Sequence, residues 1–318
     1  CSLFVLIEAL SCDMTHDAHP YQTLPDRPMK GRGSVSNRTG RFEKQITEAF
    51  DDGWLLAEEA DRAPTIRTHL GVDASRSVIT RNNSPDIPFD RSINPYRGCE
   101  HGCTYCFARP THTYQGLSAG LDFETKLFAK PDAPRLLEKE LAKPNYQPRV
   151  IAMGTNTDPY QPIEREQKIT RQLLEVLAAH NHPVAIVTKS ALVGRDIDIL
   201  APMAEKGLAK VAVSVTTLDR KLSRAMEPRA ATPERRLATI KALSDAGIPS
   251  VVMASPMIPG LNDHELEAIL TAAADNGAIY ASFILLRLPL EVRDLFVDWL
   301  HTAVPDRAER VMSLIRQM

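Results

Sequence analysis

The sequence predicts an α/β protein built on a mostly parallel sheet. Short apolar runs rich in β-branched residues alternate with stretches of helical periodicity along residues 150–302. The apolar runs do not alternate with polar residues, which is typical of strands buried on both faces of a parallel sheet. Polar or glycine-containing segments follow these runs directly, as expected where strands end in loops. Together these observations indicate the α/β class.

Each strand–helix unit can be placed on the chain. A short strand over 92–94 is expected to lead, after a long loop, to a helix over 133–142. The later strands are expected at 150–153, 184–187, 211–215, 250–254 and 281–286. Their helices are expected at 164–180, 195–206, 232–246, 263–276 and 290–302. The sequence thus predicts six strand–helix units.

Three parts are expected along the chain. Residues 1–41 are predicted to form an extended or disordered arm, because they are rich in polar residues, Gly and Pro and show no apolar period over 14–40. Residues 42–85 are expected to form an extension with one helix over 42–60, and residues 86–318 are expected to form the main domain. The basic run Lys30–Arg41 is either a solvated tail or a phosphate-contacting arm.

Both ends of the chain suggest a boundary that is not natural. We expect residues 1–13 to lie upstream of the natural start, because Met14 opens a polar stretch. At the other end the chain stops at Met318 within a helical pattern, so a truncated C-terminus is expected.

Composition limits the partners. The chain has 318 residues with a net charge of −2, so no overall field demands nucleic acid or an anionic membrane. Aromatic residues are only 6% of the chain, and no dense basic groove carries interleaved aromatics. The apolar run at 3–7 is too short to span a bilayer, so no membrane association is expected. Five cysteines, three of them within eight positions, fit a reducing cytoplasm and not a disulfide framework.

The cysteine loop is the most informative segment. Cys99, Cys103 and Cys106 follow a C-x3-C-x2-C spacing, and Gly98 and Gly102 allow a short loop to wrap one metal centre. A structural zinc site needs four ligands, and so does an ordinary ferredoxin cluster. Three cysteines would leave one iron of a four-iron cluster open to a small molecule.

Two other functions stay open from the residues alone. A zinc-binding interaction module would take His101 or His112 as its fourth ligand. A redox or sensing protein would hold an iron–sulfur cluster without turnover. Neither accounts for the polar motifs that follow each predicted strand.

Several segments resemble the radical S-adenosylmethionine (radical SAM) family, and within it the spore photoproduct lyase-like group. They include the cysteine loop with Tyr105 before its last cysteine, Asn94–Cys99, Gly154–Pro162, Thr188–Ser190 and Glu227–Arg229. The chain is most similar to uncharacterised bacterial proteins labelled DNA repair photolyase-related. The resemblance implies a partial (β/α)6 barrel of the TIM type, open on one side.

The resemblance also implies the chemistry. A [4Fe–4S] cluster on the three cysteines would bind S-adenosylmethionine, and an electron from a donor such as flavodoxin or ferredoxin would cleave it to a 5′-deoxyadenosyl radical. That radical abstracts hydrogen from the substrate. The substrate is unknown, and a nucleic-acid lesion or base is one alternative.

Cofactor-binding residues are carried over from the matching motifs. Tyr105 and Ile258 are expected beside the adenine, and Ser190 and Ser214 near the ribose or the carboxylate. Lys189 or Arg235 would pair with that carboxylate. The methionine amino group is expected at the loop after the second strand, on Gly154, Thr155, Asn156 or Asp158.

One departure separates the chain from the lyase. The lyase uses a further cysteine to return a hydrogen atom, and here no cysteine follows Cys106. Tyr160 is the catalytic residue that we expect in its place, with Tyr280 or a donor in the expected missing C-terminus as alternatives. A different substrate is the simpler expectation.

Overall fold

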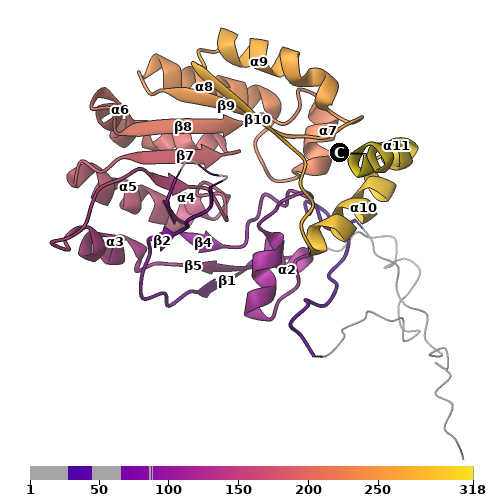
Figure 1. Ribbon diagram of the computed structural model, residues 1–318, viewed down its shortest axis with the longest axis horizontal. Coiled ribbons are helices and arrows are strands. Elements are labelled where there is room, and N and C mark those ends of the chain that lie inside the picture. The colour runs from indigo at the N-terminus through magenta and orange to yellow at the C-terminus, as the bar shows by residue number, and fades with distance from the viewer. Residues whose placement is uncertain (1–27, 45–65, 86, 88, 318) are drawn as a thin grey trace, which may run out of the picture.

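The computed structural model describes residues 28–44, 66–85, 87 and 89–317. Its main body is a seven-stranded sheet of order β10-β9-β8-β7-β6-β3-β2 (Figure 1). Six neighbouring strands are parallel: β3 (Arg91–Ile93), β6 (Ile151–Met153), β7 (Val184–Thr188), β8 (Ala209–Ser214), β9 (Ser250–Met257) and β10 (Tyr280–Leu285). The short β2 (Thr80–Arg81) pairs antiparallel with β3 at one end. Since β10 and β2 end the sheet on opposite sides, the barrel is open, and the predicted partial α/β barrel is confirmed.

Helices cover one face of this sheet. They are α3 (Ala133–Leu141), α5 (Ile169–Ala179), α6 (Ile197–Glu205), α8 (Pro233–Asp245) and α9 (Leu266–Asp275). Their apolar side chains and those of the strands form one buried core. In β7 the side chains of Val184 and Ile186 enter this core, whereas Ala185 and Val187 face the other side and are only half-buried. The face opposite the helices is therefore the less covered one.

The predicted helix over 164–180 is divided. It consists of α4 (Glu164–Gln167) and α5, with Lys168 between them at a φ of 52°. Similarly, α6 and α9 begin later than predicted, because the start of the range 195–206 belongs to a 3-10 turn, η2 (Ala191–Asp196), and the start of 263–276 belongs to another, η3 (Asp263–Glu265). These are differences of boundary and leave the order of elements as predicted.

A second, three-stranded sheet was not predicted; two of its strands follow β3 in the chain, and the third precedes β2. It has the order β1-β5-β4, with β1 (His69–Val72), β5 (Lys126–Ala129) and β4 (Tyr96–Arg97). The 3-10 helix η1 (Arg109–Gln115) and α2 (Leu121–Thr125) lie between β4 and β5 in the chain. The cysteine loop runs from β4 to η1, so this small layer supports it.

Three helices lie close together (Figure 1) and share one buried cluster with Cys103 and Tyr105, which we call the cysteine side of the molecule. They are α7 (Arg220–Met226), α10 (Glu291–Ala303) and α11 (Pro305–Arg316). Phe296 and Trp299 of α10 share a buried cluster with Cys103 and Tyr105, and Nε1 of Trp299 donates to the carbonyl of Ala225 at 3.0 Å. The helix that follows the sixth strand thus contributes to the buried cluster around the cysteine loop.

This placement corrects one expectation. The sixth strand was predicted to be buried on both faces, but every residue of β10 is exposed. Its partner β9 protects one edge only, and α10 packs with the cysteine-side cluster. Exposed fractions of 57% for Phe283 and 45% for Ile284 follow from this.

The N-terminal residues within the structure are irregular chain laid against the main domain. Arg38 pairs with Asp298 at 2.8 Å and Arg41 with Glu291 at 3.1 Å, both on α10. The predicted helix over 42–60 falls largely, and residues 1–27 fall entirely, outside the described residues, so the division into arm, extension and main domain stays a prediction. Among the described residues, no helix is long and apolar enough to cross a bilayer.

Candidate metal centre

The cysteine loop needs its two glycines. Gly98 and Gly102 have φ values of 74° and 70°, which an L-residue adopts only with strain. A carbon at the Cβ position of Gly98 would also lie 2.7 Å from the carbonyl oxygen of Phe123. The loop therefore turns tightly twice, once beside Cys99 and once before Cys103.

The three cysteines lie close together within the protein. Cys99 and Cys103 are buried, and Cys106 is half-buried. Burial raises the pKa of the Cys99 thiol, and the neighbouring Asp158, Cys103 and Cys106 raise it further. Burial likewise raises the pKa of Cys103. Thiolates are favoured here when cationic metal compensates them, so this donor set fits a thiolate-bound metal centre.

Both histidines that could complete a zinc site have other partners. Nε2 of His112 lies 2.8 Å from the carbonyl oxygen of Lys126. Nδ1 of His101 lies 3.2 Å from Oδ2 of Asp158, although the contact does not meet hydrogen-bond geometry. Among the residues that the structure describes, no group of three His, Cys, Asp or Glu is arranged around a single ion. That finding includes the three cysteines, so they do not converge on one ion; a four-iron cluster, in which each thiolate binds a different iron, is compatible with this arrangement.

The loop after β6 is hydrogen-bonded to the cysteine loop. The hydroxyl of Thr157 donates to the carbonyl of Gly98 at 2.6 Å, and Nε2 of Gln161 donates to the same carbonyl at 3.2 Å. The backbone N–H of Glu100 donates to Oε1 of Gln161 at 2.9 Å. Gln161 is fully buried, so these bonds are shielded from water. The sequence pattern identified the segment but gave no role to Gln161.

Asp158 connects this loop to the end of β7. Its carboxylate accepts from the hydroxyl of Thr188 at 2.7 Å and from the backbone N–H groups of Lys189 and Tyr160 at 2.8 Å each. Burial raises the pKa of this carboxyl, but His101 and these donors outweigh burial and lower it to about 2. Its oxygens are thus occupied by protein donors, and Asp158 holds the loop after β6 against the end of β7.

Gly154, Thr155 and Asn156 lie together at the end of β6. Gly154 has a φ of 95°, and a Cβ there would meet the carbonyl oxygen of Val187 at 2.1 Å. Asn94 at the end of β3 holds the next two residues: its Nδ2 donates to Oγ1 of Thr155 at 3.1 Å, and its Oδ1 accepts from the N–H of Asn156 at 2.9 Å. The backbone of this motif is therefore held in one conformation by close packing at Gly154 and by the hydrogen bonds of Asn94.

Tyr105 is fixed by a buried network. Its hydroxyl donates to Glu227, which also accepts from Oγ1 of Thr216 at 2.6 Å and pairs with Arg236. Burial raises the pKa of the Glu227 carboxyl, but Arg236 and Lys189 outweigh this and lower it to about 2. The sequence motif contained Glu227 but did not reveal this role, because its partners come from three separate elements.

Lys189 brings a positive charge to the same place. Its Nζ lies 5.8 Å from the centre of the Tyr105 ring. Burial lowers the pKa of Lys189, but Glu227 and Cys103 outweigh it and raise that pKa. Arg235, the alternative cation, is an exposed residue of α8. Of the two, only Lys189 faces the cysteine side.

The other three predicted cofactor-binding residues differ in burial and in their hydrogen bonds. Ile258 is fully buried in the cluster that contains Cys103 and Tyr105, with its N–H donating to Oδ1 of Asn262 at 2.6 Å. Ser190 caps η2, where its Oγ accepts from the N–H of Leu192 at 3.2 Å. Ser214 is buried at the end of β8. Ile258 is the one that the structure brings next to the cysteines.

The structure does not bring the two candidate tyrosines to the cysteines. Tyr160 is fully buried in the main core, and its hydroxyl donates to Oδ2 of Asp196 at 3.1 Å. Tyr280 stands at the start of β10, 55% exposed, with Nζ of Lys210 lying 4.5 Å from its ring centre. Tyr160 is therefore a core residue whose hydroxyl is already hydrogen-bonded.

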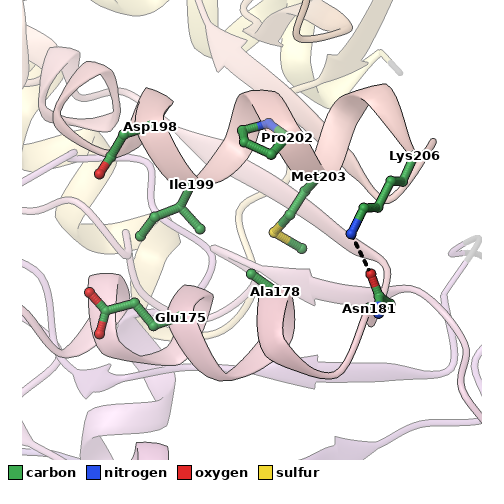
Figure 2. Close-up of a pocket in the computed structure, with 8 residues that line it drawn as sticks. All are labelled: Glu175, Ala178, Asn181, Asp198, Ile199, Pro202, Met203 and Lys206. Carbon is green, nitrogen blue, oxygen red and sulfur yellow. Dashed lines mark hydrogen bonds between the residues drawn. The ribbon is translucent and has the colours of Figure 1, made fainter.

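A groove elsewhere on the surface is separate from this site. It measures about 310 Å³ and lies between α5 and α6 (Figure 2). Its floor is Ala178, Ile199 and Met203, and a bond of 2.8 Å from Lys206 to Asn181 closes one end. It opens among the helices that cover the sheet, and no predicted site residue lines it.

The chain is similar to known proteins in sequence and in fold. Residues 93–273, more than half of the chain, match the family model described as Radical SAM superfamily. An uncharacterised protein of Mycobacterium tuberculosis is 38% identical over 237 residues, covering 74% of this chain and 70% of that protein. An uncharacterised protein of Methanocaldococcus jannaschii is 30% identical over 173 residues, covering 54% and 62% respectively.

Among solved structures, the fold is similar to that of spore photoproduct lyase with bound AdoMet and dinucleoside spore photoproduct. The TM-score is 0.54 at 16% identity, over 74% of this chain and 66% of the lyase chain. This chain thus spans slightly less than two thirds of the lyase. At that identity the likeness establishes a common fold.

Proposed function

Because the chain belongs to the radical SAM superfamily, we propose that it is an enzyme that holds a [4Fe–4S] cluster on Cys99, Cys103 and Cys106 and binds S-adenosylmethionine. The observation that carries this proposal is the loop of three close thiols, two of them buried, beside two histidines engaged elsewhere. A cluster with three protein ligands keeps one iron for a chelating small molecule.

The bound cofactors would supply reductive cleavage of S-adenosylmethionine to a 5′-deoxyadenosyl radical, which abstracts hydrogen from the substrate. The protein's part is to bind, orient and exclude water. Gly154 permits close approach of the methionine amino group to the backbone, beside Thr155 and Asn156. Lys189 pairs with the carboxylate, because its ammonium lies among the cysteine-side groups. Ile258 and the ring of Tyr105 provide an apolar contact for the adenine.

Asp158 and Glu227 act through other residues. Asp158 fixes the loop that carries Asn156 and the backbone of Lys189, and Glu227 fixes the hydroxyl of Tyr105. Their carboxylates are already saturated with donors, so we assign them to positioning. Ser190 and Ser214 stand near enough to the rim to serve the ribose, and this remains part of the proposal.

The substrate is the open part of this function. A nucleic-acid lesion or base is one candidate, supported by the common fold with a lyase whose structure holds a dinucleoside photoproduct. Against the same reaction, no cysteine follows Cys106 in this sequence. An electron donor such as flavodoxin or ferredoxin would complete the system, and Cys106, the half-buried ligand, lies nearest to solvent.

Single cysteine variants test the ligand assignment. Cys99→Ala, Cys103→Ala or Cys106→Ala removes one of three anionic donors, so each should abolish formation of 5′-deoxyadenosine from S-adenosylmethionine, measured by liquid chromatography under reducing anaerobic conditions. Cys12→Ala is the matched control and should cleave at the rate of the unaltered chain. Normal cleavage by any one of the three variants would refute the assignment.

A further inference from the structure

Glu124 is a buried carboxylate that joins segments far apart in the sequence. It lies in α2, fully excluded from solvent. Its Oε2 accepts from the backbone N–H of Gly33 at 2.9 Å, and its Oε1 accepts from that of Ser34 at 2.8 Å. Nη2 of Arg109 donates to Oε1 at 2.5 Å. A buried carboxylate is costly without such donors, so its presence depends on all three.

Arg109 connects this carboxylate to the cysteine loop. Its guanidinium is fully buried, and its Nε donates to the carbonyl of Cys103 at 2.9 Å. Its Nη1 donates to the carbonyls of Ala119 and Gly120 at 3.0 Å each. The backbone of one proposed cluster ligand is therefore held by a cation whose position Glu124 fixes.

The N-terminal segment is packed directly against the same loop. A Cβ at Gly33 would lie 1.8 Å from the carbonyl oxygen of Gly102, and a Cβ at Gly102 would lie 2.7 Å from Oε2 of Glu124. Arg32 secures the segment, because it donates to the carbonyls of Glu124 at 2.7 Å and Ile66 at 2.8 Å. Arg32 is only 9% exposed, so this part of the basic run is neither a solvated tail nor a free phosphate contact.

We propose that Glu124 is a positioning residue of the metal centre: it clamps Arg32–Ser34 and Arg109 against the cysteine loop and places a buried negative charge beside the cluster. The inference rests on the proposed function in that it takes the three cysteines as cluster ligands. It adds that residues 32–34, upstream of the family match, belong to the centre.

The negative charge of Glu124, and not only its shape, should affect the reduction potential of the cluster. Reduction adds an electron to a cluster that already carries three thiolates, and a nearby carboxylate disfavours that step. Replacing the carboxylate by an amide of the same shape leaves the positive charge of Arg109 uncompensated. The reduction potential should then become more positive.

The test compares Glu124→Gln and Glu124→Asp with the unaltered chain after anaerobic reconstitution with iron and sulfide. The iron content per chain measures whether the cysteine loop still binds the cluster. A redox titration followed by electron paramagnetic resonance measures the reduction potential of the cluster. Glu124→Gln should shift the potential to more positive values. Glu124→Asp keeps the charge but cannot reach both Gly33 and Ser34, so it should lose iron with little change in potential.

Asp122→Asn is the matched control. Asp122 lies on the same helix and also holds the N-terminal segment, through Asn37, but it is paired with Lys126 and makes no hydrogen bond or ion pair with Arg109. This variant should keep both iron and potential near the unaltered values. If Glu124→Gln does not fold, as judged by circular dichroism, Glu124→Asp decides: full iron overturns the proposal and lost iron supports it.

If the unaltered chain takes up no iron, the proposed function is wrong. If it takes up iron and responds to S-adenosylmethionine while both Glu124 variants match it in iron and potential, the role of Glu124 is refuted and the proposed function stands.

Discussion

Gly154 tests how tightly the backbone is packed where the methionine amino group is expected. Gly154→Ala would force a Cβ to 2.1 Å from the carbonyl oxygen of Val187, at a φ of 95°. Gly207 has a φ of 70° but open space around it, so Gly207→Ala should cost only the backbone strain of about 1–2 kcal/mol. Urea unfolding should show a larger loss for Gly154→Ala. Equal losses would contradict the close packing at this position.

His182 gives stability a dependence on pH. Burial lowers its pKa below the ordinary value, although its Nδ1 lies 3.1 Å from the carbonyl of Pro183 and its Nε2 2.8 Å from the Tyr146 hydroxyl. Below about pH 6.5 the unfolded chain binds a proton that the folded chain refuses, so stability falls as pH decreases; above that value both forms are neutral and the effect vanishes.

The pH effect can be isolated by substitution. In His182→Gln the loss of unfolding free energy between pH 7.5 and pH 5 should be smaller than in the unaltered chain, by less than about 1.4 kcal/mol per pH unit. Denaturant titrations at the two pH values measure it. The same slope in both proteins would mean that the pKa of His182 is not lowered by folding.

Among single residues, the sequence identified the proposed ligands better than the side chains that support them. Cys99, Cys103 and Cys106 stand out by spacing, because three cysteines on one short loop form a local pattern. Glu124 and Gln161 leave none, since their partners come from segments distant in the chain. Asp158 was found by its motif, but only the contacts revealed that its carboxylate is saturated.

At the scale of elements, the order of strands and helices could be predicted because buried parallel strands are short apolar runs between helical patterns. The break at Lys168 could not, because a single lysine in a left-handed conformation has no sequence signal. Likewise β1, β4 and β5 escaped prediction, since their burial is mixed and their pairing joins segments far apart.

The contrast between α10 and β10 yields a prediction about these elements. Phe296 of α10 is fully buried against the cysteine-side cluster, so Phe296→Ala should cost about 3–5 kcal/mol of unfolding free energy. Phe283 of β10 is 57% exposed, and Phe283→Ala should change it by no more than about 0.5 kcal/mol. Urea unfolding of the apoprotein measures both. A large loss for Phe283→Ala would mean that β10 is covered in solution.

For the whole molecule, the open sheet places the loops after β3, β6, β7 and β8 on one rim, because parallel strands end on the same side. The cysteine loop is bound there by the segment 154–162 and by residues 32–34. The predicted membership of the radical SAM superfamily is confirmed. The residue roles, the domain division and the substrate could not be fixed by sequence, since each depends on contacts or ligands that pattern does not encode.

We propose that three cysteines leave one iron of a four-iron cluster open to S-adenosylmethionine. The most direct measurement is electron paramagnetic resonance of the anaerobically reconstituted and reduced protein, recorded with and without that cofactor. We predict a four-iron signal that changes when S-adenosylmethionine is added. A signal indifferent to the cofactor would indicate a redox or sensing cluster, and uptake of stoichiometric zinc in place of iron would contradict the account altogether.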